Sequence, residues 1–167
     1  VQYRVPVSGV EIWATDHVGT FVGSSSGPLL GVWRTSVRHT ALRRRADITG
    51  GSYEVNARLG GDVRRIRGTF TGGTVQLIPR ARTKPCANER FRVTPAGAAA
   101  RGRLTLTHYR HQVFGRCLIY GASLRGTMWL RVAEDGPGSH GGLLGSTRSR
   151  IESALGIVGG WLGGILH

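Results

Sequence analysis

Residues 117–132 read CLIYGASLRGTMWLRV, and this stretch decides the fold class. Its apolar and polar side chains alternate with a period of two, which is the period of a β-strand that buries one face. We expect one face to hold Leu118, Tyr120, Ala122, Leu124, Met128, Leu130 and Val132. The opposite face then holds Ile119, Ser123, Arg125, Thr127, Trp129 and Arg131. The stretch is predicted to be one long, half-buried strand that bends at one of its glycines.

The same alternation recurs nearer the N-terminus, in SYEVNARL at 52–59, GTVQLIP at 73–79 and GRLTLTHYRHQ at 102–112. Turn-forming clusters separate such runs, among them SSSGP at 24–28 and LGGD at 59–62. A strand with its turn takes roughly ten residues, a spacing typical of antiparallel barrels and sandwiches. Residues 1–133 are therefore predicted to form an all-β domain, an antiparallel barrel or sandwich of about eight strands.

Glycine- and threonine-rich segments and the surroundings of the two cysteines carry a family resemblance. The segments are GTFVGSSSG at 19–27, ITGGSYEV at 48–55, GTFTGGTV at 68–75, CANERFRV at 86–93 and LTHYRHQVFGRCLIYGASLRGT at 106–127. On these motifs residues 1–132 resemble small secreted actinobacterial β-barrel proteins of unassigned activity. The resemblance implies a barrel fold and brings no catalytic or binding residue with it.

Cys86 and Cys117 are the only cysteines in the sequence. An even number without a CxxC pair favours one disulfide over a zinc site. A bond that closes a loop of this size stabilises a fold by roughly 3–4 kcal/mol in the chain-entropy view, and it indicates an oxidising compartment. The first residue is not Met and no signal peptide is visible, so we expect a processed chain. The predicted location is secreted or in the cell envelope.

The net charge of +14 comes almost wholly from arginine, since Lys84 is the only lysine. The choice of arginine over lysine has two interpretations, a GC-rich genome or selection for bidentate partners such as phosphate and carboxylate. The charge itself favours contact with polyanions and acidic membranes. Two clusters are candidate polyanion-binding residues: Arg43, Arg44, Arg45, Arg64, Arg65 and Arg67. The alternative is a solvated basic surface that has no dedicated partner.

Large apolar and aromatic residues in the predicted strands are candidates for contact with a small apolar ligand inside the domain. They are Trp33, Tyr53, Tyr120, Met128 and Trp129. The alternative for most of them is a packed core, which is the ordinary place for such side chains.

No catalytic residue, metal site or cofactor is predicted. His108 and His111 lie in an alternating run, so they point to opposite faces and cannot share one ion. His17 follows Asp16 as an oriented base would, but the serines at 24–26 lack the strand–turn–helix motif of a nucleophilic serine.

Two carboxylates lie in apolar or alternating segments, Glu11 next to Ile12-Trp13 and Glu54 between Tyr53 and Val55. Either can line a barrel interior, and a pair about 5–9 Å apart would suggest glycoside hydrolysis. Pairing with arginines is the alternative in a chain with this excess of positive charge.

Residues 134–149, EDGPGSHGGLLGSTRS, are predicted to form a linker, and residues 150–167 an amphipathic helix. The apolar stripe of this helix consists of Ile151, Leu155, Val158, Trp161, Leu162 and Ile165. Five glycines lie on the opposite side and cost about 1 kcal/mol each, so the helix needs an apolar partner. Three partners are open: the β domain itself, a membrane interface reached through the stripe, and another copy reached through the glycine face.

These patterns together favour a secreted, non-enzymatic binding protein whose partner is a small apolar ligand or a polyanion at its surface. One alternative is a membrane-active or envelope-associated protein that acts through the C-terminal helix, with an anionic membrane as partner. A second alternative is a small capsid or assembly subunit that self-associates through that helix.

Overall fold

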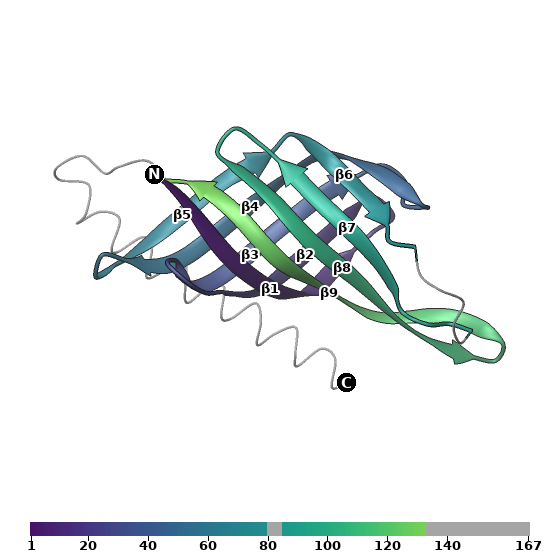
Figure 1. The fold of residues 1–167 in the computed structure, drawn as a ribbon. Helices are drawn as coiled ribbons and strands as arrows, with labels where there is room; N and C mark the ends of the chain where they lie inside the picture. Colours follow the sequence, from purple (N-terminus) through teal and green to yellow (C-terminus); the bar gives the residue numbers. More distant parts are fainter. Residues whose placement is uncertain (80–84, 133–167) are drawn as a thin grey trace.

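The computed structural model describes residues 1–79 and 85–132 (Figure 1). Nine antiparallel strands form one sheet, and these two ranges contain no helix, so the all-β antiparallel prediction is confirmed. The strands are β1 (Gln2–Ala14), β2 (Val18–Ser25), β3 (Leu30–His39), β4 (Arg45–Leu59), β5 (Asp62–Phe70), β6 (Gly72–Leu77), β7 (Glu89–Ala96), β8 (Ala100–Val113) and β9 (Arg116–Arg131).

The sheet closes on itself as a barrel (Figure 1). β9 pairs with β1, and β3 pairs with β4, so the strands in the order β3-β2-β1-β9-β8-β7-β6-β4 form a closed ring, and β5 pairs with β4 alone. β5 and β6 follow one another along β4 in a single register, with Phe70 opposite Gly51 and Thr74 opposite Asp47. The two short strands therefore share one position in the ring, which leaves eight strand positions in the barrel, as an eight-stranded closed sheet would have.

One end of the barrel is filled by large inward side chains. Trp33 is fully buried there, and so is Leu29 in the β2–β3 turn. Gly9 of β1 and Gly23 of β2 are paired directly beside Trp33 across the sheet. A Cβ at Gly9 would lie 3.0 Å from Trp33 Cζ3, so glycine makes room where the indole crosses the neighbouring strand. The buried core that results is continuous through the barrel.

The stretch quoted at the outset forms β9, and its alternation is confirmed over most of its length. Ala122, Leu124, Met128, Leu130 and Val132 are all buried. Leu118 and Tyr120, predicted on the same face, are exposed instead. The reason is a β-bulge: Tyr109 pairs with Gly121 and Arg110 with Ile119, so Tyr120 has no partner and the alternation shifts.

The β8–β9 hairpin extends beyond the barrel, where β9 has no further pairing with β1 (Figure 1). Its turn is formed by Phe114 and Gly115, both with positive φ, as a two-residue hairpin turn requires. The predicted disulfide is present, and Cys86 and Cys117 have their Cα atoms 5.3 Å apart. It joins the segment before β7 to the hairpin.

The predicted linker at 134–149 and the predicted helix at 150–167 lie outside the described residues. In the part of the chain that the structure describes, no helix has the length and apolar character to cross a membrane.

Candidate functional site

The end of the barrel opposite the β2–β3 turn is hollow. The ends of β1, β3, β6 and β8 meet there with the starts of β2, β7 and β9, because neighbouring strands run in opposite directions. The cavity has a volume of about 690 Å³. Its mouth is surrounded by the β1–β2 and β3–β4 loops and by the root of the β8–β9 hairpin.

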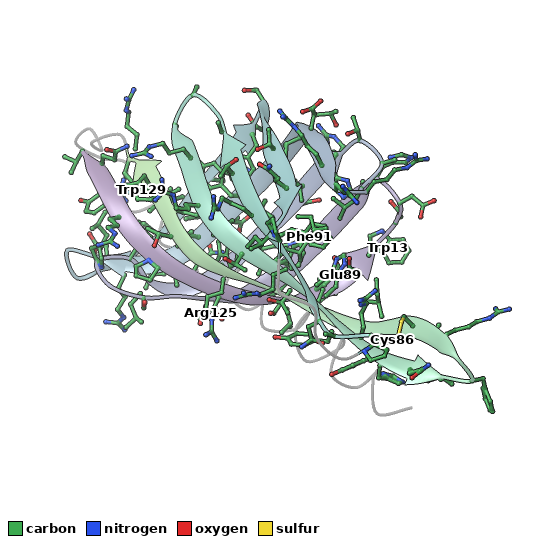
Figure 2. The ribbon with its side chains drawn as sticks, turned by 45° about the vertical axis from the view of Figure 1, so that its right-hand side comes forward. Trp13, Cys86, Glu89, Phe91, Arg125 and Trp129 are labelled. Atoms are coloured by element: carbon green, nitrogen blue, oxygen red, sulfur yellow. A yellow bond between two sulfur atoms is a disulfide. The ribbon has the colours of Figure 1, made fainter. Side chains whose placement is uncertain are left out.

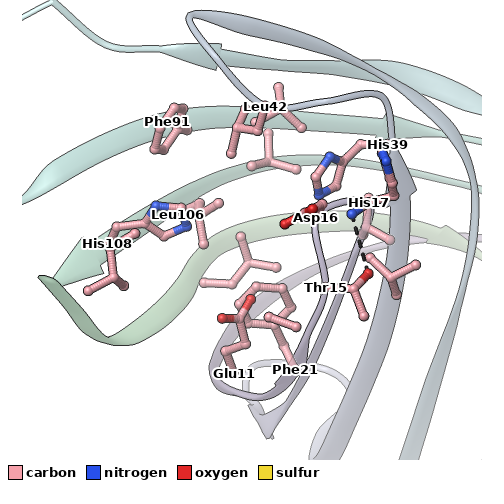
Figure 3. A pocket seen from close by; sticks show the side chains of 18 of the residues that line it. Glu11, Thr15, Asp16, His17, Phe21, His39, Leu42, Phe91, Leu106 and His108 are labelled. Atoms are coloured by element: carbon pink, nitrogen blue, oxygen red, sulfur yellow. Dashed lines mark hydrogen bonds between the residues drawn. The ribbon is translucent and has the colours of Figure 1, made fainter.

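Apolar side chains line the depth of this cavity (Figure 3). They occupy the same inward positions that carry Trp33 and Met128 at the filled end. Seven side chains of the core cluster border the open space; they are Phe21, Val37, Val75, Phe91, Val93, Leu106 and Leu124. The cavity is therefore suited to the apolar body of a ligand.

Ionisable side chains gather around the same cavity. Three carboxylates line it (Glu11, Asp16 and Glu89), whereas Asp47, Glu54 and Asp62 are the other carboxylates among the described residues. The imidazoles are His17, His39 and His108, and one guanidinium, that of Arg43, joins them. Half of the described carboxylates thus lie at one opening of a chain whose net charge is +14.

Glu11 reaches the cavity from the last paired part of β1. It pairs with Phe21, and a β-bulge at Ile12 follows before Trp13 pairs with Thr20. Gly19 leaves room for the carboxyl group, since a Cβ there would lie 3.1 Å from Glu11 Oε2. Burial raises the pKa of Glu11 from 4.5 to about 7. The carboxyl group makes no hydrogen bond or ion pair with another described residue, so it remains available to a ligand.

His108 enters the cavity from β8 and packs on Phe91, with ring centroids 5.1 Å apart. Burial lowers the pKa of His108; the charges of Arg110 and His39 lower it further, while Glu89 opposes them. Arg110 Nη1 lies 3.2 Å from Glu89 Oε1, and Nε and Nη2 donate to the Ala87 carbonyl at 3.0 and 2.9 Å. Arg110 therefore connects the rim of the cavity to the disulfide-linked segment.

The arrangement does not assemble a metal centre. Among the described residues no group of three or more His, Cys, Asp and Glu could hold a metal ion. His108 lies in the cavity, while His111 is exposed and packs on Tyr120 outside it, with centroids 4.9 Å apart. Ser25, one of the serines considered above, donates a hydrogen bond to the Leu29 carbonyl at 2.6 Å and so stabilises the β2–β3 turn.

The five residues predicted to contact an apolar ligand do not share a site, and none of them lines the cavity. Trp33, Tyr53 and Met128 belong to the packed core. Trp129 faces outward, where the Arg101 guanidinium stacks 4.3 Å from its ring centre. Tyr120 is exposed on the hairpin. Sequence alternation finds inward positions but does not say which end of the barrel they fill.

The two predicted arginine clusters lie at opposite ends of the barrel. Arg43, Arg44 and Arg45 lie at the cavity end, between β3 and the first residue of β4. Arg64, Arg65 and Arg67 belong to β5, which begins at the filled end, and Arg65 Nε lies 3.9 Å from Glu54 Oε1. The clusters therefore cannot form one continuous binding surface.

A different arginine group was missed at the sequence level because its members are spread over four strands. They are exposed, outward-facing residues of β7, β8, β9 and β1: Arg4, Arg90, Arg92, Arg101, Arg103, Arg125 and Arg131. We call this set the arginine face. The carboxylates on these four strands, Glu11 and Glu89, line the cavity instead. Only the register brings these arginines together, as when Trp129 pairs with both Arg4 and Arg101.

No protein-family model, curated protein or solved structure is significantly similar to this chain. The resemblance drawn from the sequence motifs stays a prediction.

Proposed function

We propose that this protein is a non-enzymatic binding protein that holds a small apolar ligand in the open end of its barrel. The cavity carries the proposal: about 690 Å³ of space at one end of the barrel is lined by apolar side chains. Ligand sites for small molecules have volumes of about 300–1,000 Å³, and eight-stranded barrels are wide enough to hold one such molecule.

The rim adds a preference for one polar group on the ligand. Glu11 is partly buried beside Phe21 and lacks a protein partner among the described residues. A ligand that brings a hydroxyl or amine donor to this carboxyl group would satisfy it, and a buried acceptor without a partner costs about 1–3 kcal/mol. An apolar molecule with one hydrogen-bond donor therefore fits better than a pure hydrocarbon.

The test is titration of the protein with N-phenyl-1-naphthylamine, a neutral apolar amine that fluoresces when it leaves water. Ala41 lines the cavity, and Ala41→Trp would place an indole at the mouth. We expect this variant to bind the probe at least tenfold more weakly than the unmodified protein. Ala98, an exposed alanine between β7 and β8 at the other end, gives the matched control Ala98→Trp, which should bind normally. Equal binding by both variants would contradict the proposal.

The arginine face supports a second candidate function, contact with a linear polyanion. Its seven arginines lie on four adjacent strands, and neighbouring strands of a sheet are about 4.8 Å apart. No carboxylate on these strands faces outward among them. Arg101→Gln with Arg125→Gln should lower the salt dependence of binding to a heparin column, because fewer counterions are released. Arg38→Gln with Arg58→Gln, on β3 and β4, is the control; equal effects of the two pairs would indicate only net charge.

The remaining predictions concern residues 134–167. Membrane action through the stripe from Ile151 to Ile165, and assembly through its glycine face, stay proposals on the sequence pattern alone. The disulfide is compatible with an extracellular or envelope location, which also remains a proposal.

A further inference from the structure

The β8–β9 hairpin presents apolar side chains to solvent at the mouth of the cavity. Phe114 is fully exposed at its turn, and Leu118, Ile119 and Tyr120 are 47%, 54% and 63% exposed. Trp13, at the end of β1 on the same side of the barrel, is 64% exposed. Large apolar residues are normally scattered singly on a surface, so a group of them on one projecting element marks a contact surface.

The hairpin is held in place at its root. The disulfide between Cys86 and Cys117 joins it to the segment before β7 (Figure 2). Arg110 donates two hydrogen bonds to the carbonyl of Ala87, the residue next to Cys86. On the other side, Tyr120 packs on the rings of His111 and Tyr109, with centroids 4.9 and 6.1 Å away. The exposed side chains therefore lie on a hairpin that the disulfide, the hydrogen bonds of Arg110 and the ring contacts of Tyr120 hold in place.

The charges around these side chains indicate the chemistry of the partner. Arg116 follows the turn directly, and Arg43, Arg44 and Arg45 lie across the same mouth. These four arginines outnumber the three carboxylates of the mouth, of which Glu89 is paired with Arg110. Basic side chains at a membrane surface each contribute about 1 kcal/mol of attraction to anionic lipid headgroups. Aromatic residues flanked by arginines are the composition of segments that lie in the membrane interface.

We propose that the β8–β9 hairpin inserts Phe114 and its neighbours into the interface of an anionic lipid bilayer. The cavity mouth then faces the lipid, and an apolar ligand can pass between the bilayer and the barrel without crossing water. The contact itself stands on the hairpin, whereas the transfer of a ligand rests on the proposed function.

Insertion is limited to the interface. Beyond Val10 and Ser123, β9 has no strand beside it on the β1 side, so backbone groups of the hairpin edge need water or headgroup partners. Unpaired backbone groups are not tolerated in the hydrocarbon core. The hairpin therefore anchors the barrel at the surface and does not span the bilayer.

The experiment is flotation of the full-length chain with vesicles of phosphatidylcholine alone or with 30% phosphatidylglycerol. We expect binding to the anionic vesicles and at least a tenfold loss of partitioning for Phe114→Ser with Leu118→Ser. Leu30 is equally suited as a control, since it is 64% exposed but lies at the filled end of the barrel. Leu30→Ser should partition as the unmodified chain does.

Three outcomes would overturn the proposal: no binding to anionic vesicles, equal losses in the hairpin and Leu30 variants, or unchanged binding of the hairpin variant. If, in the last case, Trp161→Ser with Leu162→Ser abolishes binding, the contact belongs to the C-terminal stripe.

Failure of the ligand proposal is distinguishable from these results. The hairpin variant should still bind N-phenyl-1-naphthylamine in solution, and Ala41→Trp should still float with anionic vesicles while losing the probe.

Discussion

Glu11 is an ionisable residue that the fold holds in a partly buried position, where the charged form of its carboxyl group is unfavourable. Its carboxyl group lies in the cavity wall next to Phe21, and burial raises its pKa to about 7. A carboxyl group whose pKa is raised on folding favours the folded state when protonated. Its contribution is therefore fully present below pH 4.5 and is lost as the pH rises through about 7.

Glu11→Gln should accordingly stabilise the protein only at high pH. At pH 8.5 we expect the free energy of unfolding to rise by about 1–2 kcal/mol, less than the full shift implies because the carboxyl group is partly exposed. At pH 4 the substitution should have little effect, since both side chains are then neutral. Urea unfolding of both proteins at the two pH values measures this difference. A gain that is the same at both values would contradict the assignment of the raised pKa to burial.

The sequence shows that Glu11 can line the barrel interior, because a carboxylate between apolar neighbours in a strand must face either the core or the solvent. The structure confirms this for Glu11 and not for Glu54, which lies on the strand face opposite the buried Tyr53 and Val55 and pairs with Arg65. Regular alternation accounts for the difference, because Glu11 follows the buried Val5 and Val7 at steps of two, and the β-bulge comes only after Glu11. The room that Gly19 leaves for the carboxyl group cannot be read without the pairing of the two strands.

At the scale of the strands, the β8–β9 hairpin is the element that the disulfide links to another part of the chain. Cys86 and Cys117 are 31 residues apart, and the bond fixes the hairpin to the segment that precedes β7. In the chain-entropy view, a loop of this length loses about 3–4 kcal/mol of unfolded-state freedom when it is closed.

Replacing both cysteines, Cys86→Ser with Cys117→Ser, should lower the free energy of unfolding by about 3 kcal/mol. The barrel should remain folded, because the buried core cluster includes neither cysteine. Chemical denaturation followed by circular dichroism provides the measurement, and reduction of the unmodified protein is the matched control. Equal stability of the oxidised and cysteine-free proteins would show that the bond does not constrain the unfolded chain.

The disulfide and most of β9 could be predicted from sequence, since they depend on a count of cysteines and on local alternation. The exposed end of β9 could not. Leu118 and Tyr120 continue an apolar pattern, yet they lie where the neighbouring strand β1 has ended and where Tyr120 forms a bulge. Strand length relative to the barrel, rather than residue type, decides their exposure.

At the scale of the whole molecule, the proposed function depends on closure of the ring. β1 and β9 are paired from Gln2 opposite Arg131 to Val10 opposite Ser123, and the Val1 amino group contacts the Val132 carbonyl at 3.4 Å. These contacts join the two ends of the described chain and enclose both the packed end and the open cavity. Alternation and turn spacing predict about eight strands, where the sheet has nine, but they do not show which end of the ring stays open.

Residues 1–132 should consequently fold without the remainder of the chain. The core cluster and all ring-closing pairs lie within this range, so we expect the truncated protein to keep its β-sheet circular dichroism and to unfold cooperatively. Chemical denaturation and light scattering of the full-length and truncated proteins test this. Loss of cooperative unfolding would show that residues 133–167 complete the core. If cooperative unfolding persists, a drop of several kcal/mol would mean that the C-terminal stripe stabilises the barrel. Unchanged stability with loss of vesicle binding or of self-association would assign the stripe to lipid or to a second copy.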